Sequence, residues 1–169
     1  MPVKSPNGKV YNTLLHYVPH GIHPDIFKPI PENDVRLNEI RKQFLGGNDY
    51  KYIVFYNSRN IQRKRTSNIM LAFRTFCDNL PEAEAKQCAL LMHTELRSEA
   101  GTDLIAVKEA FCPNNNVHFS QAKLTPDAMN ILYNISSVTI NLSSSEGFGL
   151  SCAESIMAGT LVIVTVTGG

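Results

Sequence analysis

Two carboxylates and a glycine-rich turn stand close together near the end of the sequence. The stretch "SSSEGFGLSCAES" carries Glu146 and Glu154, and Gly147 and Gly149 flank Phe148 between them. A glycine-rich turn that leads from a strand into a helix typically holds a phosphate on its backbone N–H groups. Because carboxylates repel phosphate but accept hydrogen bonds from hydroxyls, the stretch predicts a ligand that carries both an anion and hydroxyl groups.

A second candidate segment is strongly basic. The segment "SRNIQRKR" follows an apolar run, contains no acidic residue and supplies the cations Arg59, Arg63, Lys64 and Arg65. A basic run alone is usually a solvated surface. If the fold places it opposite the glycine-rich turn, however, the two loops would hold one anion from two sides.

Composition narrows the class of protein. A chain of 169 residues with a formal net charge of +1 predicts one domain, or one domain with an appendage, and no general attraction to nucleic acid. The sequence has no run of 18 apolar residues, so we expect no membrane-spanning segment. The cysteines have no metal-like spacing, and three of the four lie in apolar runs, which is typical of buried, reduced thiols in a cytosolic protein: Cys77, Cys88, Cys112 and Cys152.

Two other chemistries are poorly supported by the residues. His16, His20 and His23 lie in a proline-rich segment where Asp25 is the nearby carboxylate, so we expect no metal site there. The serine run 143–145 has no histidine and aspartate at a spacing that favours a hydrolase triad.

The elements that must position these residues alternate along the chain. Apolar runs predict strands at 52–57, 88–93, 117–119, 138–142 and 161–166, and amphipathic patterns predict helices at 34–45, 66–80, 102–111, 125–136 and 151–158. We expect Thr66 or Ser67 to cap the second helix, and Thr125 followed by Pro126 to begin the fourth.

This alternation predicts an α/β fold with a Rossmann-like, doubly wound parallel sheet in the strand order 3-2-1-4-5. We expect residues 34–169 to form this domain and residues 1–33, which hold most of the prolines, to be a connecting linker. In such a sheet the order reverses between the first and fourth strands, and ligands bind outside their carboxyl ends. The basic loop and the glycine-rich turn would therefore face the same crevice.

The stretch "SSSEGFGLSCAESIMAGTLVIVTVTGG" closely resembles the signature of retaining family 4 glycosyltransferases, which have a two-domain GT-B fold. The segment "HGIHPDIFKPI" resembles the family's interdomain connection, and "NSRNIQRKR" resembles its basic phosphate loop. The segment "NNVHFSQAKLTPDAMNILYNISSVTINLS" resembles the part that lines the nucleotide base. The resemblance covers residues 18–169 and implies that this chain is the donor-binding half of the GT-B fold.

The resemblance implies a role for each matching position. Arg59 and Lys64 would hold the diphosphate of a nucleotide-sugar donor and stabilise the leaving group, and Glu146 would contact the transferred sugar. These three are the expected catalytic residues. No cofactor and no metal is expected, because the cations replace the metal.

The remaining roles concern binding. The backbone amides of Phe148, Gly149 and Leu150 would meet sugar and phosphate, and Glu154 would bind the ribose hydroxyls. The turn near Lys123 would lie beside the base.

The chain also departs from the family pattern. Ser58 and Arg65 stand where the family has glycine, Ser155 where it has alanine and Leu161 where it has proline. None of these departures removes a charged ligand-binding residue. Arg65 adds a cation, which predicts either an additional phosphate contact or a solvated side chain.

The family's partners follow from its two-domain architecture. The acceptor, a saccharide, lipid or protein, would bind an N-terminal domain outside this chain, so we expect these residues alone to be inactive. The resemblance also stops short of the family's last strands and helices, so we expect the domain at 34–169 to be C-terminally truncated. We expect no nucleic-acid partner, self-association through the exposed interdomain surface, and a cytoplasmic location, with peripheral membrane attachment open for a full-length protein. Two alternatives also stay open: a GT-B nucleotide-sugar epimerase and a non-catalytic nucleotide-binding module.

Overall fold

A five-stranded parallel sheet organises the chain, in a computed structural model that describes residues 2–12 and 16–167. Its strand order is β5-β4-β3-β6-β7, which confirms the predicted order 3-2-1-4-5. The strands are β3 (Tyr52–Asn57), β4 (Cys88–His93), β5 (Val117–Ser120), β6 (Val138–Asn141) and β7 (Leu161–Val164). The order therefore reverses between β3 and β6, where Val54 is in register with Val138.

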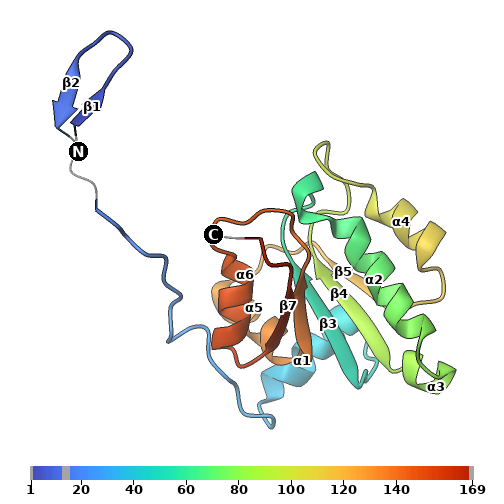
Figure 1. Ribbon diagram of the computed structural model, residues 1–169. Helices are drawn as coiled ribbons and strands as arrows, with labels where there is room; N and C mark the ends of the chain where they lie inside the picture. Colours follow the sequence, from blue (N-terminus) through green and yellow to red (C-terminus); the bar gives the residue numbers. More distant parts are fainter. Residues whose placement is uncertain (1, 13–15, 168–169) are drawn as a thin grey trace.

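Helices cover both faces of this sheet, as Figure 1 shows. One face carries α2 (Thr66–Asp78), α3 (Glu82–Ala85) and α4 (Leu104–Phe111), and the other carries α1 (Val35–Leu45), α5 (Pro126–Asn134) and α6 (Leu150–Met157). A short 3-10 turn, η1 (Gln62–Lys64), precedes α2. This layered α/β architecture is the Rossmann-like fold that the sequence predicted.

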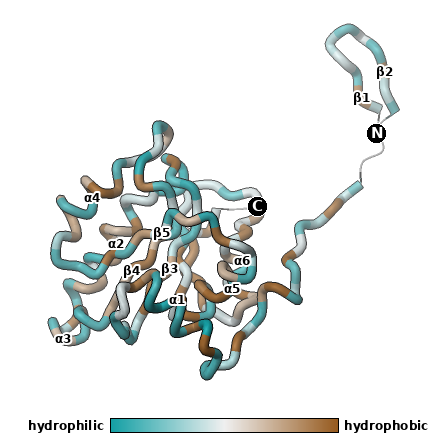
Figure 2. The backbone as a smooth tube through the Cα atoms, turned by 180° about the vertical axis from the view of Figure 1, so that it is seen from behind, coloured by the Kyte–Doolittle hydropathy of each residue, from teal (hydrophilic) through white to brown (hydrophobic). Residues whose placement is uncertain are grey.

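Alternation along the buried strands builds two separate cores. In β3, Ile53 and Phe55 pack with α1 and α5, whereas Tyr56 packs with α2 and α4 on the opposite face. Figure 2 shows the hydrophobic residues concentrated along the central strands and the hydrophilic residues along the outer loops. A central strand that is buried on both faces explains why 52–57 reads as a continuous apolar run.

Of the two helix starts for which a cap was predicted, one is confirmed and one is wrong. Thr125 accepts the amide of Ala128 at the start of α5, as predicted, and Asp103 caps α4, where no cap was predicted. The cap expected at Thr66 or Ser67 is wrong, because η1 runs directly into α2 and leaves Arg65 as the preceding residue. Arg65 has φ 50° and ψ 44°, the left-handed conformation that glycine adopts most easily.

The first 33 residues contain regular structure that the proline-rich pattern did not predict. Two short exposed strands, β1 (Pro2–Lys4) and β2 (Val10–Asn12), form an antiparallel hairpin that lies apart from the sheet in Figure 1. Further along, Phe27 is buried in the core beside α5, and the backbone N–H of Lys28 donates to Asn130 at 3.1 Å. The segment before α1 is thus fastened to the domain.

None of the helices in residues 2–12 and 16–167 combines the length and the hydrophobicity of a membrane-spanning segment. All four cysteines are free; Cys77, Cys88 and Cys112 are buried, and Cys152 is half-buried.

Candidate functional site

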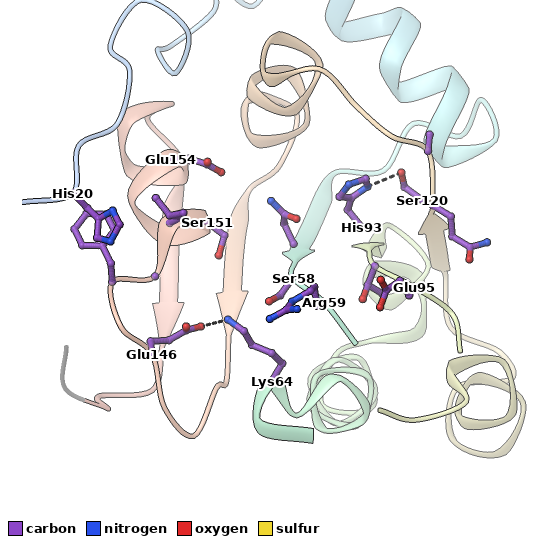
Figure 3. Close-up of a pocket in the computed structure, with 17 residues that line it drawn as sticks. His20, Ser58, Arg59, Lys64, His93, Glu95, Ser120, Glu146, Ser151 and Glu154 are labelled. Carbon is purple, nitrogen blue, oxygen red and sulfur yellow. Dashed lines mark hydrogen bonds and ion pairs between the residues drawn. The ribbon is translucent and has the colours of Figure 1, made fainter. Parts of the chain in front are cut away.

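A pocket of about 640 Å³ lies where the strands of the sheet end, around the point where the strand order reverses (Figure 3). The loops after β3, β4, β5 and β6 contribute to its wall, together with α6 and the segment before α1. The residues that line it are His20, Asn57, Ser58, Arg59, Lys64, His93, Thr94, Glu95, Ser120, Gln121, Ala122, Glu146, Phe148, Gly149, Leu150, Ser151 and Glu154.

The basic loop and the glycine-rich turn meet directly at this pocket. The backbone N–H of Ser144 donates to the carbonyl of Arg63 at 2.8 Å, and the Arg63 guanidinium donates to the carbonyl of Ser145 at 2.7 Å. These bonds join two segments about 80 residues apart and fix the distance between the two loops.

Arg59 is the pocket's uncommitted cation. Its side chain is exposed at the pocket wall, and no carboxylate among the described residues forms an ion pair with it. The next residue, Asn60, is fully buried and holds the loop: its Oδ1 accepts from Thr66 at 2.9 Å, and its Nδ2 donates to the carbonyl of Thr102. Arg59 thus stands beside a fixed backbone position.

Lys64 and Glu146 form an ion pair across the two loops, drawn as a dashed line in Figure 3. The Nζ of Lys64 donates to Oε1 of Glu146, and both side chains are largely withdrawn from solvent. Arg63 approaches the other carboxylate oxygen at 3.3 Å. The cation predicted to hold a phosphate is therefore bound to the carboxylate predicted to contact a sugar.

Two further polar residues fix the Glu146 carboxylate. The side-chain amide of Asn141 donates to Oε1 at 3.0 Å, and the hydroxyl of Ser143 donates to the same oxygen at 2.9 Å. Partial burial alone would raise the pKa of Glu146, but the hydrogen bonds from Lys64, Asn141 and Ser143 outweigh it and lower the pKa to about 2. Glu146 is consequently a permanent hydrogen-bond acceptor at neutral pH.

The glycine-rich turn presents free backbone donors. Gly149 adopts φ 78° and ψ 55°, which turns the chain into α6. Within residues 2–12 and 16–167, the amides of Phe148, Gly149 and Leu150 donate to no protein acceptor. A helix start with unpaired N–H groups attracts an anion.

The segment before α1 also reaches this turn. The imidazole of His20 lies against the ring of Phe148, with ring centroids 5.0 Å apart, and both residues line the pocket. The proline-rich pattern did not indicate this contact, because His20 carries no periodic signal and lies 128 residues from its partner.

Glu154 projects into the pocket from α6 (Figure 3). The hydroxyl of Tyr133 donates to its Oε2 at 2.7 Å, and the side-chain amide of Asn57 donates to the Tyr133 oxygen at 3.0 Å. Burial raises the pKa of Glu154, and the Tyr133 hydrogen bond partly counteracts this rise. Sequence reasoning missed Tyr133 because its place on the apolar side of the helix marked it as core.

The far end of the pocket is built by the ends of β4 and β5. His93 Nδ1 and the Ser120 hydroxyl lie 2.9 Å apart, and burial lowers the pKa of His93, which favours the neutral imidazole. The hydroxyl of Thr94 is buried there and has no hydrogen-bond partner in the described part of the chain. Gln121 and Ala122 line this end, whereas Lys123 is exposed just beyond them and is not part of the lining.

The departures from the family pattern have local consequences. Arg65 does not line the main pocket and lies instead at a smaller pocket beside Thr66 and Thr102. Ser155 is buried, and its hydroxyl donates to Thr139 at 2.9 Å. Leu161 is exposed at the start of β7.

The arrangement suits one kind of ligand. A free guanidinium and unpaired amides favour an anion, and two fixed carboxylates favour hydroxyl donors on either side of it. Over the described ranges, no three His, Cys, Asp or Glu side chains gather into a group that could hold a metal ion.

Comparisons with known proteins agree with this description. The family described as "Glycosyl transferases group 1" matches residues 38–169. No curated protein matches the chain in sequence.

Solved structures share the fold. The C-terminal domain of the glycosyl transferase group 1 family protein LpcC from Francisella tularensis has a TM-score of 0.67 at 18% identity, over 88% of this chain and 72% of that domain. A glycosyltransferase from Rickettsia africae gives 0.68 at 21% identity, over 88% of this chain and 37% of that one. Anabaena Alr3699/HepE, solved in complex with UDP-glucose, gives 0.65 at 19% identity, over 88% and 38%.

Proposed function

Because this chain belongs to the group 1 glycosyltransferases, we propose that its pocket binds a nucleoside-diphosphate sugar for transfer to an acceptor hydroxyl. Its fold is that of the Rossmann-like domains found in GT-B glycosyltransferases. The observation that carries the proposal is the placement of a free cation, unpaired amides and two carboxylates around one pocket at the reversal of the strand order.

In this proposal Arg59 and the amides of 148–150 bind the diphosphate. Glu154 accepts hydrogen bonds from the ribose hydroxyls, and Glu146 accepts them from the transferred sugar. Because Lys64 also lines the pocket, it can exchange the Glu146 carboxylate for a phosphate oxygen when the donor binds. The base then extends toward Thr94 and the turn at 121–123, beside the ends of β4 and β5.

The catalytic contribution of these residues is electrostatic. Cleavage of the bond between the sugar and the diphosphate leaves negative charge on the departing phosphate, and cations already in place stabilise that charge. We propose that Arg59 and Lys64 supply this stabilisation without a metal ion, and that the sugar retains its anomeric configuration.

The acceptor requires further surface. The chain spans 37–38% of the Rickettsia and Anabaena structures, so the activity of a whole enzyme is itself a proposal. We propose that the acceptor hydroxyl is delivered by another domain, because transfer needs it about 3–3.5 Å from the sugar carbon in a site closed to water. These 169 residues alone are then expected to bind donor without acceptor-dependent turnover.

Calorimetric titration against UDP-, GDP- and ADP-sugars tests the binding proposal. We expect one nucleotide class to bind, an excess of EDTA to leave its affinity unchanged, and Arg59→Ala to weaken it about 10- to 100-fold, the value of one charge-assisted contact. Arg97→Ala is the matched control, since Arg97 is an exposed arginine paired with Asp103 outside the pocket lining. No binding in any class, or equal affinity for the wild type and Arg59→Ala, would contradict the proposal.

A further inference from the structure

Three residues from three elements form a hydrogen-bonded row that ends in the pocket. The side-chain amide of Asn57, at the end of β3, donates to the hydroxyl oxygen of Tyr133 on α5 at 3.0 Å. That hydroxyl donates to Oε2 of Glu154 on α6 at 2.7 Å. Tyr133 is fully buried, and its ring makes edge contacts with Phe27 and Phe55 in the core. The row therefore connects a rigid part of the domain to a side chain at the pocket wall.

The order of donors along this row has a fixed direction. An amide nitrogen only donates, so Asn57 occupies a lone pair of the Tyr133 oxygen and the single phenolic proton points to Glu154. One carboxylate oxygen of Glu154 is thereby engaged, and the other remains available to accept from a ligand. Because the ring of Tyr133 is held by core packing, the position of the carboxylate is set by the core as well as by α6.

We infer that Tyr133, oriented by Asn57, is a positioning residue that holds Glu154 with one oxygen directed at the two vicinal hydroxyls of a nucleotide ribose. This inference rests on the proposed function, because it assigns a task within the same pocket. A carboxylate that is fixed before the ligand arrives loses less side-chain entropy on binding than a mobile one.

The hydrogen bond from Tyr133 also favours the ionised form of Glu154. Burial raises the pKa of Glu154 and the Tyr133 hydrogen bond opposes the rise, so loss of the hydroxyl raises the pKa further. Ligand binding that needs the carboxylate is lost as pH falls through this pKa, and a variant without the hydroxyl loses it at a higher pH. Other charged and titratable groups line the same pocket: His20, Arg59, Lys64, His93, Glu95 and Glu146. The pH profile of a Glu154→Gln variant shows the effect of these groups alone, so the difference from the wild type reports the titration of Glu154.

The experiment compares UDP, GDP and ADP with dUDP, dGDP and dADP by calorimetry between pH 5 and pH 8. For the base that the wild type binds, we expect the ribose form to bind about 10-fold more tightly than the deoxy form. Tyr133→Phe should reduce that ratio to about 1- to 3-fold and move the acidic loss of affinity to higher pH. In a Glu154→Gln background, Tyr133→Phe should change neither quantity.

Tyr56→Phe is the matched control for this substitution. Tyr56 is also fully buried, and its hydroxyl has no hydrogen-bond partner in the described part of the chain, so the same chemical change should leave the ratio and the pH profile as in the wild type. If Tyr133→Phe fails to fold, Asn57→Ala provides a second test, because it removes the donor that orients the hydroxyl and should shift both readouts in the same direction.

The outcomes distinguish a failure of the proposed function from a failure of the inference about Tyr133. If the wild type binds none of the six nucleotides, the proposed function fails and the inference fails with it. If the wild type prefers a ribose form and Tyr133→Phe keeps the same ratio and pH profile, the inference alone is overturned. If adding Tyr133→Phe to the Glu154→Gln variant lowers the ratio or moves the pH profile as much as it does in the wild type, the inference is also overturned, since the hydroxyl would then act by another route.

Discussion

Lys64 donates a hydrogen bond to Glu146, although 82 residues separate them in the sequence. One would bind the phosphates of the proposed donor and the other its sugar, yet in the structure the two side chains form an ion pair with each other. A diphosphate must therefore compete with Glu146 for Lys64. A sugar hydroxyl that donates to the Glu146 carboxylate makes it easier for Lys64 to leave Glu146 and bind the diphosphate. The ion pair therefore couples recognition of the sugar to recognition of the diphosphate.

This competition predicts an unusual effect of Glu146→Gln. Removing the carboxylate charge frees Lys64, so bare nucleoside diphosphates should bind about 3- to 10-fold more tightly, or about 0.6–1.4 kcal/mol. The advantage of a nucleotide-sugar over its bare nucleotide should shrink in the same variant. Calorimetry measures both effects. Glu95→Gln is the control and should leave both affinities unchanged, because Glu95 lines the pocket but forms no ion pair with Lys64. Weaker binding of bare nucleotide by Glu146→Gln would disprove the competition.

The same ion pair predicts a pH-dependent stability. The pKa of Glu146 is lowered from its ordinary value of 4.5 to about 2, so its contribution is complete above pH 4.5 and is lost as pH falls through about 2. Glu146→Gln should be less stable than the wild type at pH 6, and the difference should narrow progressively toward pH 2. Urea unfolding at pH 6, 4 and 2.5 measures this, and a difference independent of pH would refute the assignment.

The left-handed backbone at Arg65 predicts a stabilising substitution. Among the described residues it is the one non-glycine with a positive φ, at 50°, and such strain costs on the order of 1 kcal/mol or more. Arg65→Gly should raise the Tm by about 2–4 °C. Arg65→Ala removes the same charge without relieving the backbone and should give no increase. Thermal unfolding of the three proteins decides the matter, and equal Tm values for both variants would point to charge instead of strain.

Close packing against Asn60 predicts that Gly101 tolerates no side chain. A Cβ at Gly101 would overlap the backbone and side-chain oxygens of Asn60, the residue that fixes the loop carrying Arg59. Gly101→Ala should lower the free energy of unfolding by about 1–3 kcal/mol and weaken nucleotide binding through displacement of that loop. Gly21→Ala, where a Cβ meets nothing within 4 Å, should behave as the wild type in urea unfolding and calorimetry. Wild-type behaviour of Gly101→Ala would show that this contact does not hold the loop.

Much of the fold could be predicted because its central strands are short, apolar and buried on both faces. The bounds of β3 and β4 match the apolar runs 52–57 and 88–93, and the Thr125–Pro126 pair marks the start of α5. The hairpin of β1 and β2 could not be predicted, because all six of its strand residues are exposed and carry no burial pattern. The left-handed conformation of Arg65 was not predicted either, because arginine rarely adopts it and stands here where the family has glycine.

The candidate site was predictable in its location and less so in its internal contacts. Loop chemistry and strand order placed the basic loop opposite the glycine-rich turn, and the structure joins them through Ser144 and Arg63. The ion pair of Lys64 with Glu146 was not predicted, because each residue had been given a ligand as its partner. Asn141 and Tyr133 lie within a predicted strand and a predicted helix, and a sequence does not reveal which buried polar atom hydrogen-bonds to a pocket residue.

The most direct test of the central claim is to locate nucleotide binding on the protein. In ¹⁵N-labelled protein titrated with the best-bound nucleoside diphosphate, we expect the amide shifts to change in residues 58–64, 93–95, 120–122 and 146–154. The amides of α3 and of the β1–β2 hairpin, which lie away from the pocket, should stay unchanged. Saturable shifts confined to the predicted ranges would support a donor site at the reversal of the strand order. Shifts elsewhere, with residues 146–154 unaffected, would contradict it.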